Sequence, residues 1–262
     1  MIKRLKKAYL GIILFILYAP VFLLMVFSFN DSKTPIWTGF TFKWYVELFN
    51  DPNIQRAFYY TLFIAVVSSG IATVIGTMAA MGIDKMVRWK KNFLMNTTYI
   101  PLLSPDIVIG ISLMLLYKAI GMPLGLTTLI LSHVTFCIPY VILSVMPRLK
   151  QMNHHIYEAA LDLGASPFYA FQKVILPEIM PGVISGAFIA FTLSIDDFVV
   201  SFFNTAAGVD TLSIQIYSMA RRGINPKINA VSTLMFIAII VILIIVNIRS
   251  NQVLKKESEK GE

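Results

Sequence analysis

Three aspartates stand inside strongly apolar stretches of this 262-residue chain. Asp106 lies in Ser-Pro-Asp-Ile-Val, and Asp196 and Asp197 lie together in Phe-Thr-Leu-Ser-Ile-Asp-Asp-Phe-Val-Val. A carboxylate near the middle of a lipid-spanning helix costs about 2.5–3.5 kcal/mol on insertion scales. Because the core of these apolar stretches offers no Lys or Arg as a counter-ion, the acids favour a positively charged ligand from outside the chain. The alternative, that each acid is satisfied by a hydrogen bond between helices, stays open.

The two neighbouring acids are not equivalent if both lie on one helix. Successive residues of an α-helix point about 100° apart. We therefore expect one of Asp196 and Asp197 to line a pathway and the other to pair with a neighbouring subunit.

Four aromatic side chains supply a second feature that attracts cations. Their ring faces can attract ammonium groups, at about 0.5–2 kcal/mol each. With the three acids, they form the predicted substrate pathway, although ordinary packing remains the alternative for each ring. The four are Phe136, Tyr140, Phe198 and Tyr217.

The sequence offers no other reactive constellation. Its one cysteine, Cys137, excludes an internal disulfide and any cysteine-based metal cluster, and the histidines His133, His154 and His155 show no metal-ligand spacing. The phosphate-binding loop, the zinc-protease helix and the Gly-x-Ser-x-Gly elbow are all missing from the sequence. We expect no catalytic residue, no metal and no cofactor bound by this chain, so any ATP hydrolysis would belong to another chain.

The elements that must position these residues are membrane-spanning helices. Hydrophobic residues make up 57% of the chain and charged residues 14%, against about 25% charged in a soluble domain. The net charge of +8 does not indicate nucleic acid, because the basic residues lie in short clusters between apolar runs. Six runs reach the roughly 20 residues that cross a bilayer, which predicts an all-α integral membrane protein with one transmembrane domain over residues 1–262. The predicted spans are Ala8–Phe29, Phe58–Ile83, Ile100–Ala119, Thr127–Met146, Pro181–Phe203 and Asn229–Ile248.

The distribution of Lys and Arg predicts the orientation. Fifteen of the 22 basic residues fall on the side of the two termini, and seven on the other side. The richer side faces the cytoplasm, so both termini are predicted to be cytoplasmic.

The cytoplasmic loop 147–180 is the most informative soluble segment. Its first half shows apolar residues at helical spacing and ends at Gly164, which suits a helix stop. Ser166 and Pro167 then suit the start of a second short helix, which we expect Pro177 to end before Pro181 opens the next span. The first apolar stripe consists of Ile156, Ala159, Ala160 and Leu163.

This loop resembles the Glu-Ala-Ala motif of binding-protein-dependent ABC importer permeases. The pattern runs Glu158-Ala159-Ala160, three residues, Gly164, nine residues, then Val174-x-Leu176-Pro177, with valine where the family usually has isoleucine. The resemblance implies the type I (MetI-like) importer fold with both termini inside. It also implies that Glu158, Ala159, Ala160, Gly164, Leu176 and Pro177 form a coupling loop that docks on an ATPase subunit.

A further resemblance, over nearly the whole chain, is to permease subunits of spermidine/putrescine importers. It rests on the two acid-bearing segments, on His-Val-Thr-Phe-Cys-Ile-Pro-Tyr-Val from His133 to Val141, and on Ile216-Tyr-Ser-Met. It implies a multi-pass protein of the bacterial inner membrane that imports polyamines. The implied partners are a second related permease, a homodimer of ATPase subunits that bind ATP and magnesium, and an extracytoplasmic polyamine-binding protein.

Two rivals stay open at this stage. The same importer class could carry another cargo, such as an amino acid, a metal chelate, thiamine or a sugar. A secondary transporter could instead use the acids for protons or sodium; that class predicts inverted repeats and interrupted helices, which the sequence does not reveal convincingly.

Overall fold

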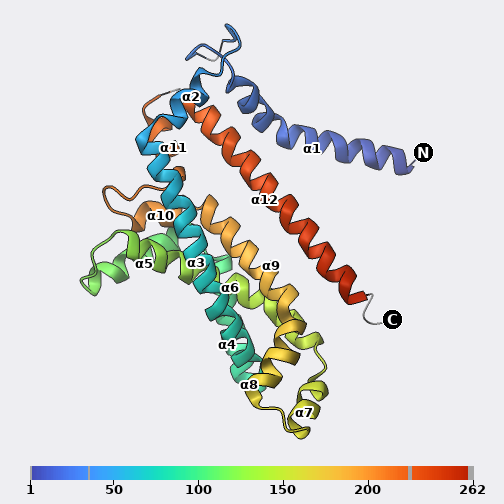
Figure 1. Ribbon diagram of the computed structural model, residues 1–262. Coiled ribbons are helices and arrows are strands. Elements are labelled where there is room, and N and C mark those ends of the chain that lie inside the picture. The colour runs from blue at the N-terminus through green and yellow to red at the C-terminus, as the bar shows by residue number, and fades with distance from the viewer. Residues whose placement is uncertain (1, 35, 224–225, 259–262) are drawn as a thin grey trace. The chain divides into compact units, whose positions relative to one another are not determined.

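The computed structural model describes residues 2–34, 36–223 and 226–258, and throughout these residues the regular structure is helical apart from one isolated bridge between Asn30 and Phe40 (Figure 1). The described side chains exclude those of residues 2–5, 7, 8, 154, 242, 243 and 245–258. The chain divides into two compact units, residues 1–57 with 212–244 and residues 58–211 with 245–262.

The core of the first unit, residues 1–57 with 212–244, contains a buried tryptophan. The unit contains α1 (Ile2–Phe27), α2 (Lys43–Phe49), the start of α3 (Pro52–Asp84), α11 (Leu212–Arg221) and α12 (Pro226–Ser258) as far as residue 244. Trp44 is 2% exposed, and its Nε1 donates a hydrogen bond to the backbone oxygen of Asn30 at 2.6 Å. The Lys227 ammonium lies 3.3 Å from Glu47 and 3.7 Å from Asp51, which ties the start of α12 to α2 and its end.

The second unit, residues 58–211 with 245–262, is a bundle of long helices. Its elements are the rest of α3, α4 (Arg88–Leu103), α5 (Asp106–Ala119), α6 (Leu126–Gln151), α7 (His154–Asp162), α8 (Pro167–Ala170), η1 (Phe171–Ile175), α9 (Leu176–Asp196) and α10 (Val199–Asn204). Helices α6 and α9 run against each other, and α5 packs on α10.

Small residues allow the close approach of α6 and α9. A methyl group added at Gly182 would lie 2.7 Å from the Ser144 carbonyl oxygen, and one at Gly186 would lie 3.1 Å from Val141 Cα. Val141 is itself fully buried in a core shared with α3. The two helices therefore touch backbone to backbone, as small residues permit in membrane helices.

Among the described residues, four helices are long and apolar enough to span a membrane. They are Tyr9–Phe27, Pro52–Asp84, Leu126–Gln151 and the continuous helix Pro167–Asp196. They confirm the predicted first, second and fourth spans and most of the fifth. The predicted sixth span begins in the apolar stretch Pro226–Val241 of α12, and residues 242–248 lie, except for Ile244, outside the described side chains.

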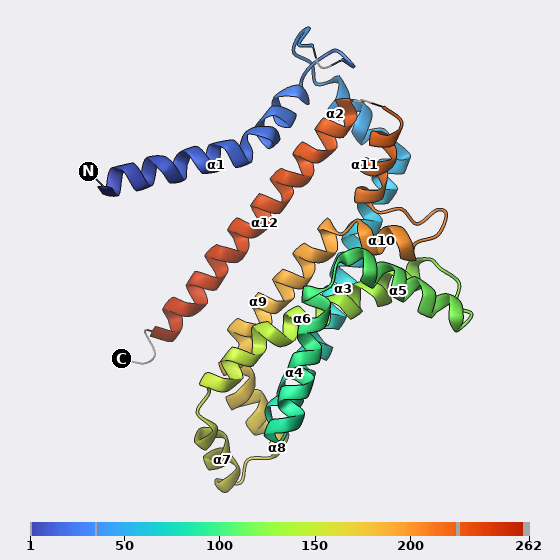
Figure 2. The ribbon, with the colours of Figure 1, turned by 180° about the vertical axis from the view of Figure 1, so that it is seen from behind.

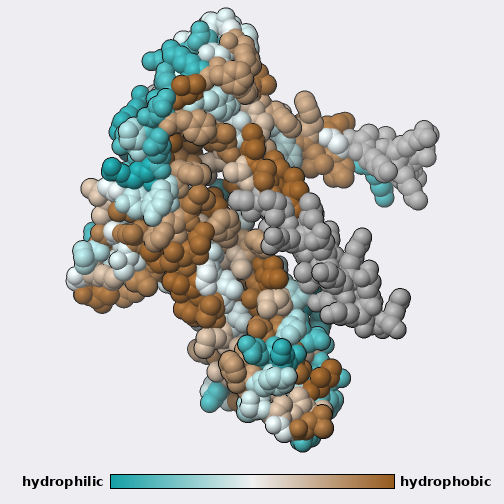
Figure 3. Space-filling model, viewed as in Figure 1, coloured by the Kyte–Doolittle hydropathy of each residue, from teal (hydrophilic) through white to brown (hydrophobic). Residues whose placement is uncertain are grey.

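Apolar side chains cover much of the surface of the second unit. Along α3, Phe58, Val66, Val74 and Met78 are 51–63% exposed. On the visible face, hydrophobic residues gather over the long helices, and hydrophilic residues gather near the end that carries α7 (Figure 3). This pattern suits a chain whose sides face lipid or apolar partner helices.

The third predicted span is not one straight helix. Helices α4 and α5 are separated at Ser104 and Pro105 and are bent by 106°. Ser104 is extended, with ψ of 141°, because the ring of a following proline disfavours the helical conformation.

The fifth predicted span, Pro181–Phe203, is also wrong at both ends. The helix starts earlier, because α8, η1 and α9 run on from Pro167 through both Pro177 and Pro181, and the π-helical turn at Phe171–Ile175 precedes the first of these prolines. Such a wider turn adjusts the backbone hydrogen-bond pattern where a proline removes a donor. The helix ends earlier too, since Asp197 has ψ of 129° and α10 begins afresh at Val199.

The loop after α6 follows the first half of its predicted plan, although α6 itself continues through Pro147 to Gln151. Helix α7 ends before Gly164, whose φ is +87°, and the Ser166 hydroxyl accepts a hydrogen bond from the Tyr169 amide at the start of α8. The first short helix and the glycine corner are therefore confirmed, but the second short helix is wrong, because Pro177 does not end it and α8 continues into the long helix Pro167–Asp196. Within this unit, α7 and α8 lie at the end opposite to α5 and α10 (Figures 1 and 2).

Candidate functional site

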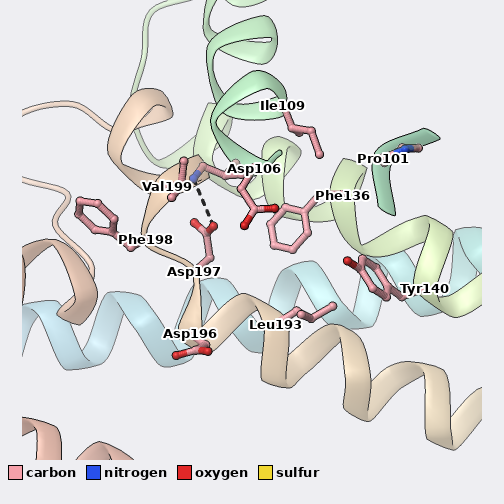
Figure 4. A pocket seen from close by; sticks show the side chains of 11 residues that line it. Pro101, Asp106, Ile109, Phe136, Tyr140, Leu193, Asp196, Asp197, Phe198 and Val199 are labelled. Carbon is pink, nitrogen blue, oxygen red and sulfur yellow. Dashed lines mark hydrogen bonds between the residues drawn. The ribbon is translucent and has the colours of Figure 1, made fainter. Parts of the chain in front are cut away.

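A pocket of about 300 Å³ opens in the second unit where the two broken spans meet. It is walled by α4, α5, α6, the end of α9 and the start of α10 (Figure 4). The eleven lining residues are Pro101, Asp106, Ile109, Phe136, Tyr140, Leu193, Asp196, Asp197, Phe198, Val199 and Val200.

The pocket collects six of the seven residues predicted for the substrate pathway. They are Asp106, Asp196, Asp197, Phe136, Tyr140 and Phe198. The seventh, Tyr217, lies on α11 in the other unit, where the guanidinium of Arg221 lies 5.9 Å from its ring centroid.

Each acid stands at a helix end. Asp106 is the first residue of α5, where the unpaired amide groups of the first turn favour a carboxylate. Asp196 is the last residue of α9, at the carbonyl end whose partial negative charge favours cations. Asp106 and Asp196 are both exposed. The breaks therefore place carboxylates around one space, which suits a cation.

Unlike Asp106 and Asp196, Asp197 is largely buried, and it has hydrogen-bond donors beside it. Its carboxylate accepts hydrogen bonds from the amides of Val200 at 3.2 Å and Ser201 at 2.7 Å, and its side chain is 9% exposed. Asp197 is thus satisfied by hydrogen bonds, as the alternative left open for these acids allowed, and its donors are backbone amides that the broken helix frees beside it. In Figure 4 its carboxylate points toward that of Asp106, beside the ring of Phe136.

The expectation that Asp196 and Asp197 point in different directions assumed that both lie on one helix, and this assumption does not hold. Asp197 is not helical, so the 100° rule does not apply between it and Asp196. Both residues line the same pocket. Lys and Arg do not occur among the described residues that line it, so its formal charge is negative.

A buried histidine behind the pocket was not among the predicted site residues. His133 is 0% exposed, and its Nε2 lies 3.6 Å from an Asp197 carboxylate oxygen. Its ring nitrogens bond the hydroxyls of Ser194 and Ser201. No signal in the sequence marks this cluster, because its members lie on different helices, with Ser194 on α9, Ser201 on α10 and His133 on α6.

The residues predicted to couple to an ATPase lie at the other end of the unit. The Glu158 side chain is 68% exposed, its carboxylate lies 3.4 Å from His155 Nδ1, and Ala159 is exposed as well. Gly164 forms the corner, with nothing within 4 Å of an added methyl group. Leu176 and Pro177 belong to the first turn of α9 rather than to a loop.

Large apolar side chains surround this corner without being covered. Ile156 is 51% exposed, Leu163 89%, Phe168 71% and Tyr169 55%. From the corner, one continuous 30-residue helix, Pro167–Asp196, leads to the acids of the pocket. At 1.5 Å per residue it is about 45 Å long, which is enough to cross a bilayer.

These features define the class of protein. Several apolar helices of spanning length, two of the predicted spans broken around an acidic pocket, and an exposed apolar corner at the far end describe a multi-pass helical transport protein of a membrane. Residues 72–256 match the family model described as the binding-protein-dependent transport system inner membrane component, and the chain belongs to this family.

Curated relatives extend over almost the whole chain. The chain is 39% identical to the spermidine/putrescine transport system permease protein PotC of Escherichia coli strain K12, over 99% of this chain and 97% of that protein. It is 41% identical to the putrescine transport system permease protein PotI of the same strain, over 85% of this chain and 82% of that protein. The prediction that the chain is a permease subunit and not an enzyme is confirmed by these relationships.

Solved structures agree on the fold. A chain of a bacterial ABC transporter that imports the acidic polysaccharide alginate superposes with a TM-score of 0.75 and 19% identity, over 96% of this chain and 97% of that one. A chain of the MetNI methionine ABC transporter gives a TM-score of 0.61 and 21% identity, over 76% and 94%. Interrupted helices, which were the expectation for a secondary transporter, are present in this chain. Family membership nevertheless identifies the chain as an importer subunit.

Proposed function

We propose that this chain is the membrane-spanning subunit of an ATP-driven importer that carries polyamines such as spermidine and putrescine into the bacterial cytoplasm. The observation that carries the proposal is the 39% identity, over 99% of this chain, to a spermidine/putrescine permease. The acidic pocket is the part of the chain that suits such a cargo, since polyamines bear several ammonium groups on a flexible methylene chain.

The chain crosses the inner membrane six times, with both termini in the cytoplasm. Four of the crossings are the spanning helices, one is the bent pair α4 and α5, and the last is α12, whose described apolar stretch is Pro226–Val241. It also leaves the 15 basic residues of the richer side inside the cell. The corner at Gly164 then lies in the cytoplasm, and the pocket lies toward the outer half of the membrane.

The partners follow from that orientation. A binding protein delivers polyamine at the outer face, and a second, related permease completes the pathway. A pair of ATPase subunits, which hold ATP and magnesium, grips one coupling corner from each permease. The exposed apolar side chains beside Gly164 fit this contact, because an interface core needs such anchors.

In the pocket, the carboxylates offset the loss of water around the ammonium groups. Phe136, Tyr140 and Phe198 offer ring faces to the same charges. The pocket holds the cargo weakly, since Asp106 and Asp196 remain exposed to water that screens their charge. Rigid movement of the helix from Pro167 to Asp196 links closure of the ATPases to the pocket at its other end.

The test is polyamine uptake by the reconstituted complex, with the binding protein at saturation. Changing Asp106, Asp196 and Asp197 together to Asn removes the negative charge at nearly constant volume. Loss of even one charged hydrogen bond to the cargo lowers uptake by about tenfold. The matched control is Glu178→Gln, an exposed acid at the opposite end of α9.

Normal uptake by the triple variant would remove the acids from the pathway. Competition separates the cargos: unlabelled spermidine should suppress putrescine uptake, whereas an amino acid, a metal chelate, thiamine or a sugar should not. Uptake that continues on an ion gradient without the ATPase would overturn the importer itself.

A further inference from the structure

His133 is a fully buried polar side chain in the first half of α6, and the proposed pathway does not use it. It does not line the pocket, but it touches two residues that do. The centroid of its ring lies 5.2 Å from that of Phe136, and its Nε2 lies 3.6 Å from Asp197 Oδ2. A buried imidazole is costly unless both nitrogens are satisfied, and here both are.

The partners of the two nitrogens come from the two sides of the helix break. Nδ1 lies 2.7 Å from the hydroxyl of Ser194, in the last turn of α9. Nε2 lies 3.0 Å from the hydroxyl of Ser201, on α10. One rigid ring on α6 therefore spans the joint at which the fifth predicted span is interrupted.

The angle between α9 and α10 at this break sets the direction of the Asp197 carboxylate. Its two oxygens accept the amides of Val200 and Ser201, so they move with α10. Its own backbone follows the end of α9. Any rotation of α10 against α9 would turn the carboxylate in the pocket.

We propose that His133 is a positioning residue for the cargo site, and this rests on the proposed function of Asp197 in polyamine passage. By bridging Ser194 and Ser201, the imidazole holds α10 at a set angle to α9 and keeps the Asp197 carboxylate directed toward the pocket. The simpler alternative is a core histidine that stabilises the bundle and has no bearing on the cargo.

Two substitutions distinguish the contacts of the two ring nitrogens, because each side-chain amide can replace only one of them. The amide of Gln reaches the position of Nε2, beside Ser201 and Asp197, whereas the amide of Asn reaches only the position of Nδ1, beside Ser194. Each substitution removes one end of the bridge, so both should lower uptake. His133→Asn, which loses the end beside Asp197, should lose more, about tenfold, the effect of one buried hydrogen bond.

The discriminating measurement is a double-mutant cycle with Asp197→Asn in the reconstituted complex. If His133 acts through Asp197, the double variant His133→Asn/Asp197→Asn takes up polyamine no more slowly than the slower single variant. A purely structural role predicts that the two losses multiply and that the amount of assembled complex falls in parallel. Ser132→Ala is the control, because this neighbouring buried serine bonds the Tyr117 hydroxyl and not the joint.

The outcomes are distinct. Normal uptake by His133→Asn, or multiplied losses, overturns the positioning role while leaving the acidic pathway intact. Normal uptake by Asp197→Asn alone overturns the role of that acid and the positioning role with it. If His133→Asn does not assemble, Ser194→Ala takes its place in the cycle, since it removes the hydroxyl at Nδ1 and leaves the Ser201 amide on Asp197.

Discussion

The close approach of α6 and α9 predicts that Gly182 cannot be enlarged. In Gly182→Ala, the new methyl carbon would lie 2.7 Å from the Ser144 carbonyl oxygen, 2.9 Å from Arg148 Cγ and 3.2 Å from Val145 Cα. The Arg148 side chain can move aside, but the carbonyl and the Cα belong to the backbone of α6. To restore an ordinary contact of 3.4 Å, α6 and α9 must separate locally by about 0.7 Å.

The expected cost follows from that separation. Overpacking of this kind destabilises by about 1–3 kcal/mol. Replacing a helical glycine by alanine also gains up to about 1 kcal/mol from helix propensity, which partly hides the clash. Gly82→Ala in α3 is the matched control, because nothing lies within 4 Å of its added methyl group and only the gain remains.

The assay is the midpoint of thermal unfolding of the purified complex. The difference between the two variants isolates the clash, and we expect Gly182→Ala to melt about 2–12 °C below Gly82→Ala. Uptake should fall as well, because α6 and α9 both wall the pocket. Equal midpoints for the two variants would refute the argument that these helices meet backbone to backbone.

Two further substitutions test other parts of the chain. Trp44→Phe removes the indole donor from the Asn30 carbonyl and should destabilise the first unit by about 1–3 kcal/mol, seen as a lower unfolding midpoint; an unchanged midpoint would contradict a structural role for that 2.6 Å bond. Gly164→Trp should let the ATPases hydrolyse ATP without matching uptake, whereas Gly164→Asn should stay coupled because asparagine tolerates positive φ. The measurement is the ratio of polyamine imported to ATP hydrolysed, and equal ratios in both variants would argue against docking at this corner.

Much of the fold was open to prediction because hydropathy and length are local properties. Long apolar runs, the glycine corner at Gly164 and the cap at Ser166 all depend on neighbours in the chain, and the structure has them where expected. The spacing of Glu158, Gly164 and Pro177 is local too, and it indicated the family that the family model then matched. The single transmembrane domain and the roles of the site residues stay predictions.

The residues of the pocket were also largely predictable, since an acid in an apolar run has a cost that a sequence displays. Six of the seven chosen side chains line one cavity. Their environment was not predictable, because whether an acid has a partner depends on backbone groups that only a helix break releases. Asp197 illustrates this, since the amides of Val200 and Ser201 would be bonded inside a continuous helix.

The amino-acid sequence by itself determined which segments are apolar enough for a membrane, which loop forms the corner, and which acids and rings are available. Only the tertiary structure decided that a span also breaks at Asp197, that this break and the proline break at Pro105 face one pocket, and that His133 bridges the break at Asp197. A break frees backbone donors and acceptors that must find partners elsewhere. Those partners come from helices distant in sequence, so apolar periodicity along one segment does not reveal them.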